Sequence, residues 1–354
     1  MSKYWSEITK SIEPYVCGEQ PKDKKYIKLN TNESPYPPSP KVLEAIKNAA
    51  NGDLRLYPDP DCDELRSTIA EYYNLNKDEI FIGNGSDEVL AFSFLTFFNT
   101  NETIVFPDIS YSFYPVYAGL YNLKYRLAKL QEDFSIPISE FIGKNGGVVI
   151  PNPNAPTGRY LDVDSIKKIL NCNSNKVVII DEAYIDFGGD SVVELIKDYD
   201  NLLVIQTLSK SRSLAGIRVG FAMGNKELIQ GLNRVKNSFN SYTIDRVAAS
   251  AAMAAIKDED YFKQCVEKII KTRERIVKKL NSLGFNVIPS EANFIFITHK
   301  NYAANDLFIK LREKSVLVRY FNKEKINNYL RVSIGSDEEM DFFIEKFQEI
   351  IDEV

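Results

Sequence analysis

Short runs of consecutive apolar residues recur between about residues 78 and 222. Each run is too short for a helix and is separated from the next by residues with helical spacing. This alternation predicts strand–helix units that build a mostly parallel sheet, buried on both faces. The predicted strands are Ile80–Ile82, Thr103–Phe106, Val148–Ile150, Val177–Ile180, Leu202–Ile205 and Val219–Ala222.

The pattern changes after about residue 240. A long amphipathic helix is predicted over roughly 259–282, ending at Gly284. Strands and a last helix follow, which is typical of a smaller α+β unit. The strands are Phe294–Ile297, Val316–Val318 and Tyr329–Ser333, and the last helix begins at Ser336 with Glu339 in a capping box.

The N-terminal residues are rich in proline and predict an extended arm. A helix is expected after Asp61, with Asp61 as its cap and Glu64 completing a capping box. The predicted fold is therefore α/β, a mostly parallel central sheet with flanking helices plus a smaller α+β domain. We divide the chain into an arm (1–40), which packs on the small domain and a partner subunit, a large domain (41–255) and a small domain (256–354).

Composition excludes several classes of function. The 354 residues include one histidine, His299, which removes Ser-His-Asp machinery with a second histidine and any multi-histidine metal site. The four cysteines form no CxxC pair, so no metal site is expected and a reducing cytoplasm is favoured. The net charge is −5 without a basic tract, which argues against nucleic acid. No apolar run approaches the ~18 residues needed to span a membrane.

Polar residues follow four of the predicted strands. Ligands of parallel sheets bind beyond the carboxyl ends of the strands, so these positions are candidates for function. The segments are Gly83–Asp87, Pro151–Gly158, Asp181–Tyr184 and Thr207–Gly220. Each one has a plain structural interpretation as well: a turn with a helix cap, a proline corner, a salt bridge or a solvated lysine.

The chemistry of these segments is complementary. The glycines and helix start near Ser86 favour an anion, as do hydroxyls together with Arg218. Lys210 can react as an amine with an aldehyde, and the carboxylate of Asp181 can meet a cationic ligand atom. Together they supply what pyridoxal phosphate needs: an anion cradle, an amine and a partner for the ring nitrogen.

The order of these motifs resembles fold type I aminotransferases. It runs Asn-Gly-Ser-Asp, Pro-Asn-Ala-Pro-Thr-Gly, Asp-Glu-Ala-Tyr, Thr-Leu-Ser-Lys and Gly-Ile-Arg. The N-terminal Leu-Asn-Thr-Asn-Glu and Arg-Leu-Tyr-Pro narrow the resemblance to the histidinol-phosphate aminotransferase family, over nearly the whole chain. The resemblance implies a homodimeric, cytoplasmic enzyme with pyridoxal 5′-phosphate as cofactor.

The resemblance also implies the roles of single residues. Lys210 would bind the cofactor and then move the proton of the substrate α-carbon. Asp181 would pair with the pyridinium nitrogen, and Tyr184 would donate to the phenolic oxygen. The remaining cofactor contacts would be the phosphate ligands Ser86, Asp87, Thr207, Ser209 and Arg218, the stacking Tyr111, and Tyr57 from the partner subunit.

One position departs from the family pattern. Many relatives have asparagine immediately before Pro-Thr-Gly, where it binds the phenolic oxygen, but this chain has Ala155 there. Either the loop shifts so that the preceding Asn154 reaches the ring, or Tyr184 acts alone. We expect Asn154 to make the contact.

For the substrate, the resemblance implies that Arg331 binds the anionic end of both substrates in alternate half-reactions. Arg319 would be a second contact with the substrate phosphate, and Tyr15 and Asn32 would close the site. The implied reaction converts histidinol phosphate and 2-oxoglutarate to imidazole-acetol phosphate and glutamate, in histidine biosynthesis.

Four rival functions remain. A threonine-phosphate decarboxylase or an aromatic-amino-acid aminotransferase would share the fold. A cofactor-sensing regulator would need a DNA-binding unit, for which the chain has no basic extension. A nicotinamide dehydrogenase would need a GxGxxG motif after an early strand, which is absent.

Overall fold

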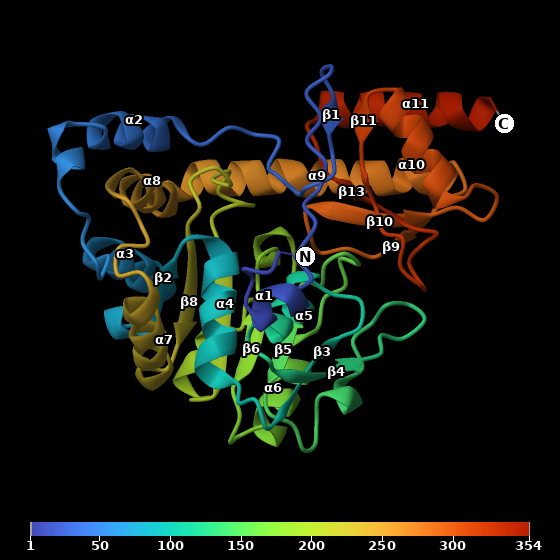
Figure 1. The fold of residues 1–354 in the computed structure, drawn as a ribbon. Coiled ribbons are helices and arrows are strands. Elements are labelled where there is room, and N and C mark those ends of the chain that lie inside the picture. The colour runs from blue at the N-terminus through green and yellow to red at the C-terminus, as the bar shows by residue number, and fades with distance from the viewer. Residues whose placement is uncertain (1, 354) are drawn as a thin grey trace.

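The computed structural model describes residues 2–353. It is built around a seven-stranded sheet with helices on both sides, next to a smaller sheet covered by the C-terminal helices (Figure 1). The strands of the large sheet lie in the order β2 (Ile80–Gly83), β8 (Gly220–Gly224), β7 (Leu202–Thr207), β6 (Val178–Asp181), β5 (Val148–Pro151), β3 (Thr103–Pro107) and β4 (Lys124–Ala128).

The prediction of a mostly parallel sheet is confirmed. Within the large sheet only β8 runs antiparallel to its neighbours. Strands β5, β6 and β7 are buried at every position, so their side chains contribute hydrophobic stabilisation on both faces, at about 1.5–3 kcal/mol for each large apolar residue. Strand β4 was not predicted because it is an edge strand with four exposed residues out of five.

Helices cover the large sheet and connect its strands. They are α2 (Pro40–Ala49), α3 (Asp63–Tyr73), α4 (Gly85–Phe97), α5 (Phe113–Leu120), α6 (Val163–Cys172), α7 (Lys226–Phe239) and α8 (Arg246–Lys257). A short helix α1 (Glu7–Ser11) lies in the N-terminal arm. No helix within residues 2–353 is long and apolar enough to cross a membrane.

The smaller unit contains an antiparallel sheet in the order β12 (Arg319–Tyr320), β13 (Leu330–Ser333), β10 (Phe294–Thr298) and β9 (Asn286–Ile288). Its helices are α9 (Glu259–Ser282), α10 (Ala304–Glu313) and α11 (Asp337–Asp352). Helix α9 crosses the upper part of Figure 1, from above the large sheet to the small one. The predicted capping box of Ser336 and Glu339 is confirmed.

The N-terminal arm joins the small unit through a strand. Strand β1 (Ile27–Lys28) pairs in parallel with β11 (Val316–Leu317), so the predicted strand at 316–318 binds the arm instead of the small sheet. Because the arm is held there, the residues that follow β1 are carried toward the large sheet. The domain boundaries after residues 40 and 255 stay a prediction.

The start of α3 differs from the expectation. The residue before the helix is Cys62 in a left-handed conformation, and the backbone N–H of Asp63 donates to Asp59 Oδ2 at 2.7 Å. Asp59 therefore caps the helix from across a turn, and the prediction that Asp61 and Glu64 form the cap is wrong.

Candidate active site

The four predicted segments meet at one edge of the large sheet. In the strand register Gly83 and Thr207 both lie opposite Gly220, and Asp181 lies opposite Pro151 and Ile205. The parallel strands end at this edge, whereas antiparallel β8 begins there. The residues after the parallel strands and the residues before β8 are therefore brought together.

A cavity with a volume of about 100 Å³ opens at this edge. It is lined by most of the predicted cofactor ligands; Asn154 and Tyr57 are not among the lining residues. The lining consists of Ser86, Asp87, Tyr111, Pro151, Ala155, Asp181, Ala183, Tyr184, Thr207, Ser209, Lys210 and Arg218.

Asp181 is a buried carboxyl group at the end of β6. Burial raises its pKa to about 6, although Tyr114 Oη donates to Oδ2 at 2.7 Å and the backbone N–H of Ala183 to Oδ1 at 3.3 Å. Within residues 2–353 no lysine, arginine or histidine nitrogen forms an ion pair with it. A buried carboxylate without a cation is costly, so this position favours a ligand that brings a positive charge.

Tyr114 is a site residue that the sequence analysis missed. It is completely buried, and it holds the carboxylate of Asp181 through the hydrogen bond described above. Its ring lies edge-on to Tyr111, at 5.7 Å between centroids. Its position three residues after Tyr111, in the first turn of α5, is the sequence signal that could have identified it.

Asp87 fixes two other groups of the cavity. Its Oδ1 accepts from Tyr111 Oη at 2.6 Å, and its Oδ2 accepts from Arg218 Nη2 at 3.1 Å. The carboxylate therefore orients the aromatic ring and the guanidinium. An anion at this place would meet the backbone N–H groups at the start of α4 together with Arg218.

Two glycines allow the backbone and Arg218 to approach each other closely at this anion site. Gly85 has φ +78°, and a Cβ there would lie 2.4 Å from Arg218 Nη2. A Cβ on Gly220 would lie 2.3 Å from the backbone nitrogen of Ser86. Arg218 itself has φ +57°, a strained conformation for a residue with a side chain. The absence of side chains at these glycines thus leaves room for the guanidinium of Arg218 and for the start of α4. The backbone strain lies at Arg218, a predicted phosphate-binding residue.

Lys210 lies between the large sheet and the arm. Its Nζ is 3.2 Å from the carbonyl oxygen of Thr31 and 5.7 Å from the ring centroid of Tyr184. Tyr184 Oη accepts a hydrogen bond from Asn32 Nδ2 at 3.0 Å, and Asn32 Oδ1 accepts from Ser333 Oγ at 2.9 Å. Asn32 therefore connects the tyrosine of the large sheet to the small sheet.

The structure does not bring Asn154 into the cavity. The residue is fully buried, and its Nδ2 donates to the carbonyl oxygen of Ile109 at 3.0 Å and to Thr157 Oγ1 at 2.9 Å. Ala155 lines the cavity at this point. Of the two alternatives, the geometry favours Tyr184 as the donor to a phenolic oxygen.

A second cavity adjoins the first and is lined by the predicted substrate residues Tyr15, Asn32, Arg319 and Arg331. The two cavities share Tyr111, Ala155, Tyr184 and Lys210. Tyr15 stacks on Phe113 at 4.3 Å between ring centroids, which gives this cavity an aromatic wall. A ligand in the second cavity would therefore touch the residues that line the first.

Two arginines face this second cavity from neighbouring strands. Arg319 and Arg331 are direct partners in the register of β12 and β13, and neither forms an ion pair with a carboxylate within residues 2–353. Arg331 is the more enclosed of the two, so that burial lowers its pKa, and its Nε has no partner. Like charges directly opposite destabilise a strand pair. An anion between them would remove that cost.

Tyr57 lies outside both cavities of its own chain. Its side chain is 77% exposed and stacks on Tyr242, with ring centroids 4.7 Å apart. An exposed tyrosine at this position is available to a second molecule.

The residues of the first cavity fit pyridoxal phosphate. Asp181 lacks a cation, Lys210 supplies an amine, and the helix start at Ser86 with Arg218 forms a cradle for an anion. Such a cofactor would supply an electron-accepting ring and an aldehyde. The protein groups are thus complementary to each part of that molecule.

Comparison with known proteins agrees with the geometry. Residues 24–347 match the family model described as "Aminotransferase class I and II". The histidinol-phosphate aminotransferase of Clostridium botulinum (strain Langeland) is 73% identical, with both chains covered completely. That of Clostridium beijerinckii is 62% identical, over 99% of this chain and 98% of the relative.

The fold is also that of solved structures. The histidinol-phosphate aminotransferase of Sinorhizobium meliloti, in complex with pyridoxal-5′-phosphate, superposes with a TM-score of 0.89 at 23% identity, covering 99% of each chain. At this identity the likeness shows the fold alone, but the full-length relatives settle the family. The chain belongs to the class I and II aminotransferases and, within them, to the histidinol-phosphate aminotransferase family.

Proposed function

We propose that the protein transfers the amino group of histidinol phosphate to 2-oxoglutarate, giving imidazole-acetol phosphate and glutamate, with pyridoxal 5′-phosphate as cofactor. The observation that carries the proposal is the pair of arginines without carboxylate partners, Arg319 and Arg331, in a cavity continuous with the one that contains Lys210. An anion site in a cavity that a reactive amine also lines suits a substrate with a phosphate at one end and an amino group at the other.

The bound cofactor would supply the electron-accepting ring, and the protein groups have separate tasks. Asp181 would keep a proton on the ring nitrogen, because a cation stabilises its buried carboxylate. The amine of Lys210 takes and returns the proton at the substrate α-carbon, a role that the single buried histidine does not share. Tyr184 would donate to the phenolic oxygen. Ser86, the backbone of Asp87, Thr207, Ser209 and Arg218 would hold the phosphate.

The two half-reactions use one substrate site. Arg331, the more buried arginine, binds the carboxylate of glutamate and the phosphate of histidinol phosphate in turn. Arg319 is partly exposed and adds a second contact for the doubly charged phosphate. Tyr15 and Asn32 close the site from the arm.

Replacing the two arginines should separate these roles. Arg331→Ala should lower kcat/KM by about 10²-fold for both substrates, since it removes hydrogen bonds to a charged group worth about 1.5–3 kcal/mol. Arg319→Ala should cost about tenfold for histidinol phosphate and less than about threefold for glutamate. Steady-state kinetics with each substrate measures both effects.

Arg126→Ala is the matched control, because this exposed arginine pairs with Glu140 at the edge strand, away from both cavities. It should change neither substrate. If Arg331→Ala weakened only one of the two substrates, shared recognition by Arg331 would be wrong.

We further propose a homodimer that works in the cytoplasm and binds no nucleic acid. Exposed apolar residues occur in two segments that Tyr57 and Tyr242 bring together: Leu54 and Leu56 in one, Phe239 in the other. A second copy would cover this surface and receive Tyr57 at its cofactor phosphate. The free cysteines support a reducing compartment.

Hybrid dimers test the contribution of Tyr57. One chain carries Lys210→Ala, and the other carries a replacement of Tyr57 that blocks cofactor binding. If Tyr57 acts across the interface, both lesions fall in one site and the other site is intact, so the hybrid should regain about half of the parent activity, as the count of intact sites requires. Activity of affinity-purified hybrids measures this. An assembled hybrid without activity would place Tyr57 in its own subunit.

A further inference from the structure

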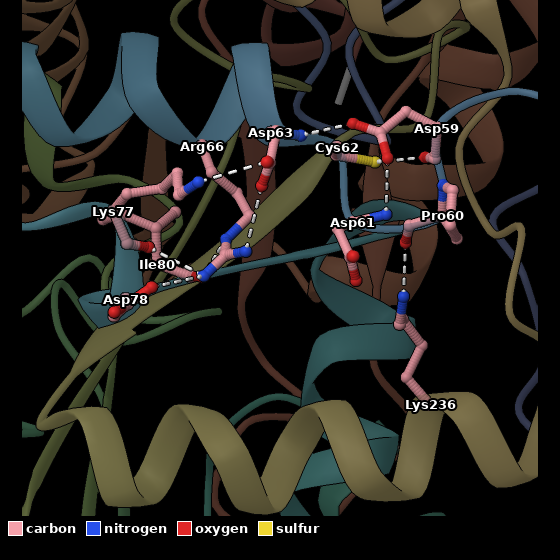
Figure 2. A network of polar contacts seen from close by, with 10 residues as sticks. All are labelled: Asp59, Pro60, Asp61, Cys62, Asp63, Arg66, Lys77, Asp78, Ile80 and Lys236. Carbon is pink, nitrogen blue, oxygen red and sulfur yellow. Dashed lines mark hydrogen bonds and ion pairs between the residues drawn. The ribbon is translucent and has the colours of Figure 1, made fainter.

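Lys236 is a buried lysine that no proposed step uses. It lies in the last turn of α7 and is 3% exposed. Its Nζ donates to the carbonyl oxygen of Pro60 at 2.5 Å (Figure 2). The carbonyl oxygen of Ser241 lies 3.5 Å from the same nitrogen. Within residues 2–353 no carboxylate forms an ion pair with it. Burying an ammonium group costs free energy unless it forms hydrogen bonds. The role of Lys236 is therefore to be sought in the two segments whose carbonyl groups it contacts.

The first carbonyl belongs to a tightly structured turn that follows Tyr57. The carboxylate of Asp59 accepts hydrogen bonds from the backbone N–H groups of Asp61 at 3.0 Å and Asp63 at 2.7 Å. Figure 2 shows this turn directly above the ammonium group of Lys236. Because hydrogen bonds within the turn fix its shape, the contact of Lys236 with Pro60 also restrains the residues on either side of Pro60.

The second carbonyl belongs to the segment between α7 and α8, which supports Tyr57 from the other side. Tyr242 stacks on the Tyr57 ring, and Arg246 Nη2 donates to the carbonyl oxygen of Tyr57 at 2.7 Å. Asn84 Nδ2, next to the start of α4, donates to the carbonyl oxygen of Thr243 at 3.3 Å. The same segment is thus joined to the candidate phosphate cradle.

From these contacts we propose that Lys236 is a positioning residue for Tyr57. Its ammonium group connects the turn after Tyr57 to the segment that carries Tyr242, and so fixes the direction in which the exposed tyrosine points. The inference rests on the proposed contact of Tyr57 with the cofactor phosphate of a second subunit. It adds the residue that makes this contact rigid.

Loss of the ammonium group should therefore weaken cofactor binding only in a protein that still has the hydroxyl group of Tyr57. Lys236→Met keeps the length and packing of the side chain and removes its donors. We expect it to raise the dissociation constant for pyridoxal phosphate about tenfold in the parent, and less than about twofold in a Tyr57→Phe background. Such non-additivity is the signature of two residues that act through one contact.

The measurement is titration of the apoprotein with pyridoxal phosphate, followed by absorbance, for the parent, both single variants and the double variant. Lys226→Met, an exposed lysine at the start of the same helix, is the matched control and should leave the affinity unchanged. Equal losses in both backgrounds, or no loss, would overturn the inference. If Lys236→Met does not fold, Lys236→Gln takes its place in the same comparison.

A readout without cofactor uses Cys62, which lies in the turn. Its thiol is partly buried, and burial raises its pKa to about 11. In the apoprotein, Lys236→Met should increase the labelling rate of Cys62 at least about tenfold, while the buried Cys265 of α9 stays unchanged. Unchanged labelling of Cys62 would show that the turn is held without Lys236, and would overturn the inference.

These outcomes are distinct from failure of the proposed reaction. A protein that binds the cofactor but does not react with histidinol phosphate leaves the binding and labelling results standing. A Tyr57→Phe variant with unchanged cofactor affinity removes the role of Lys236 without touching the substrate assignment.

Discussion

Lys210→Ala should reduce the transamination rate by more than about 10³-fold. General acid–base catalysis by a positioned group contributes 10²–10⁴-fold, and this lysine also binds the cofactor. The variant should still bind pyridoxal phosphate, because Ser86, Ser209 and Arg218 are unchanged and surround the predicted phosphate position. Turnover and bound cofactor are measured on the same preparation.

Borohydride reduction followed by peptide mapping identifies the reactive lysine. The parent should carry the reduced cofactor on Lys210, and the variant should carry none. Lys197→Ala, an exposed lysine outside both cavities, should behave as the parent does. Cofactor fixed to any other lysine would contradict the assignment of the whole site.

Asp181→Ala should lower kcat by about 10²-fold or more. Asp181 is buried, and an opposite charge close to an ionisable group shifts its pKa by about one to three units, each worth 1.36 kcal/mol. Without that carboxylate the nitrogen loses its proton and the ring accepts electrons poorly. Tyr114→Phe, which removes one hydrogen bond to Asp181, should cost about tenfold or less.

Single-turnover kinetics separates this effect from binding. Glu182→Gln is the control, since Glu182 is the next residue along, is equally buried, and accepts hydrogen bonds from Ser191 and Gln206 outside the cavity. It should keep kcat within about threefold. If Asp181→Ala also stayed within about threefold of the parent, Asp181 would be structural only.

The sequence predicts the buried part of the fold well. Strands β5, β6 and β7 are apolar on both faces, so their residues form short runs that are easily recognised. The strands that were missed lack this signal: β4 is mostly exposed, β9 is fully buried at one of three positions, and β1 and β12 have two residues each. The pairing of these strands depends on tertiary contacts, which leave no signal in the local sequence.

The site could be predicted as a set of segments but not in its details. Parallel strands bring their carboxyl ends together, which places Asp181 and Lys210 at one edge. Which residue of a proline-rich loop faces the cavity depends on the backbone: Asn154 turns inward to Ile109, and Ala155 lines the cavity. The pairing of Arg319 with Arg331 follows from antiparallel register and was equally invisible in the sequence.

The most direct test of the proposed reaction is a half-reaction with purified protein. Histidinol phosphate, threonine phosphate, phenylalanine and tyrosine are each added to the cofactor-loaded enzyme, while absorbance of the aldehyde form and release of carbon dioxide are followed. We predict that histidinol phosphate converts the cofactor from aldehyde to amine fastest and without carbon dioxide. Carbon dioxide released from threonine phosphate, or faster conversion by phenylalanine or tyrosine, would contradict the proposed function.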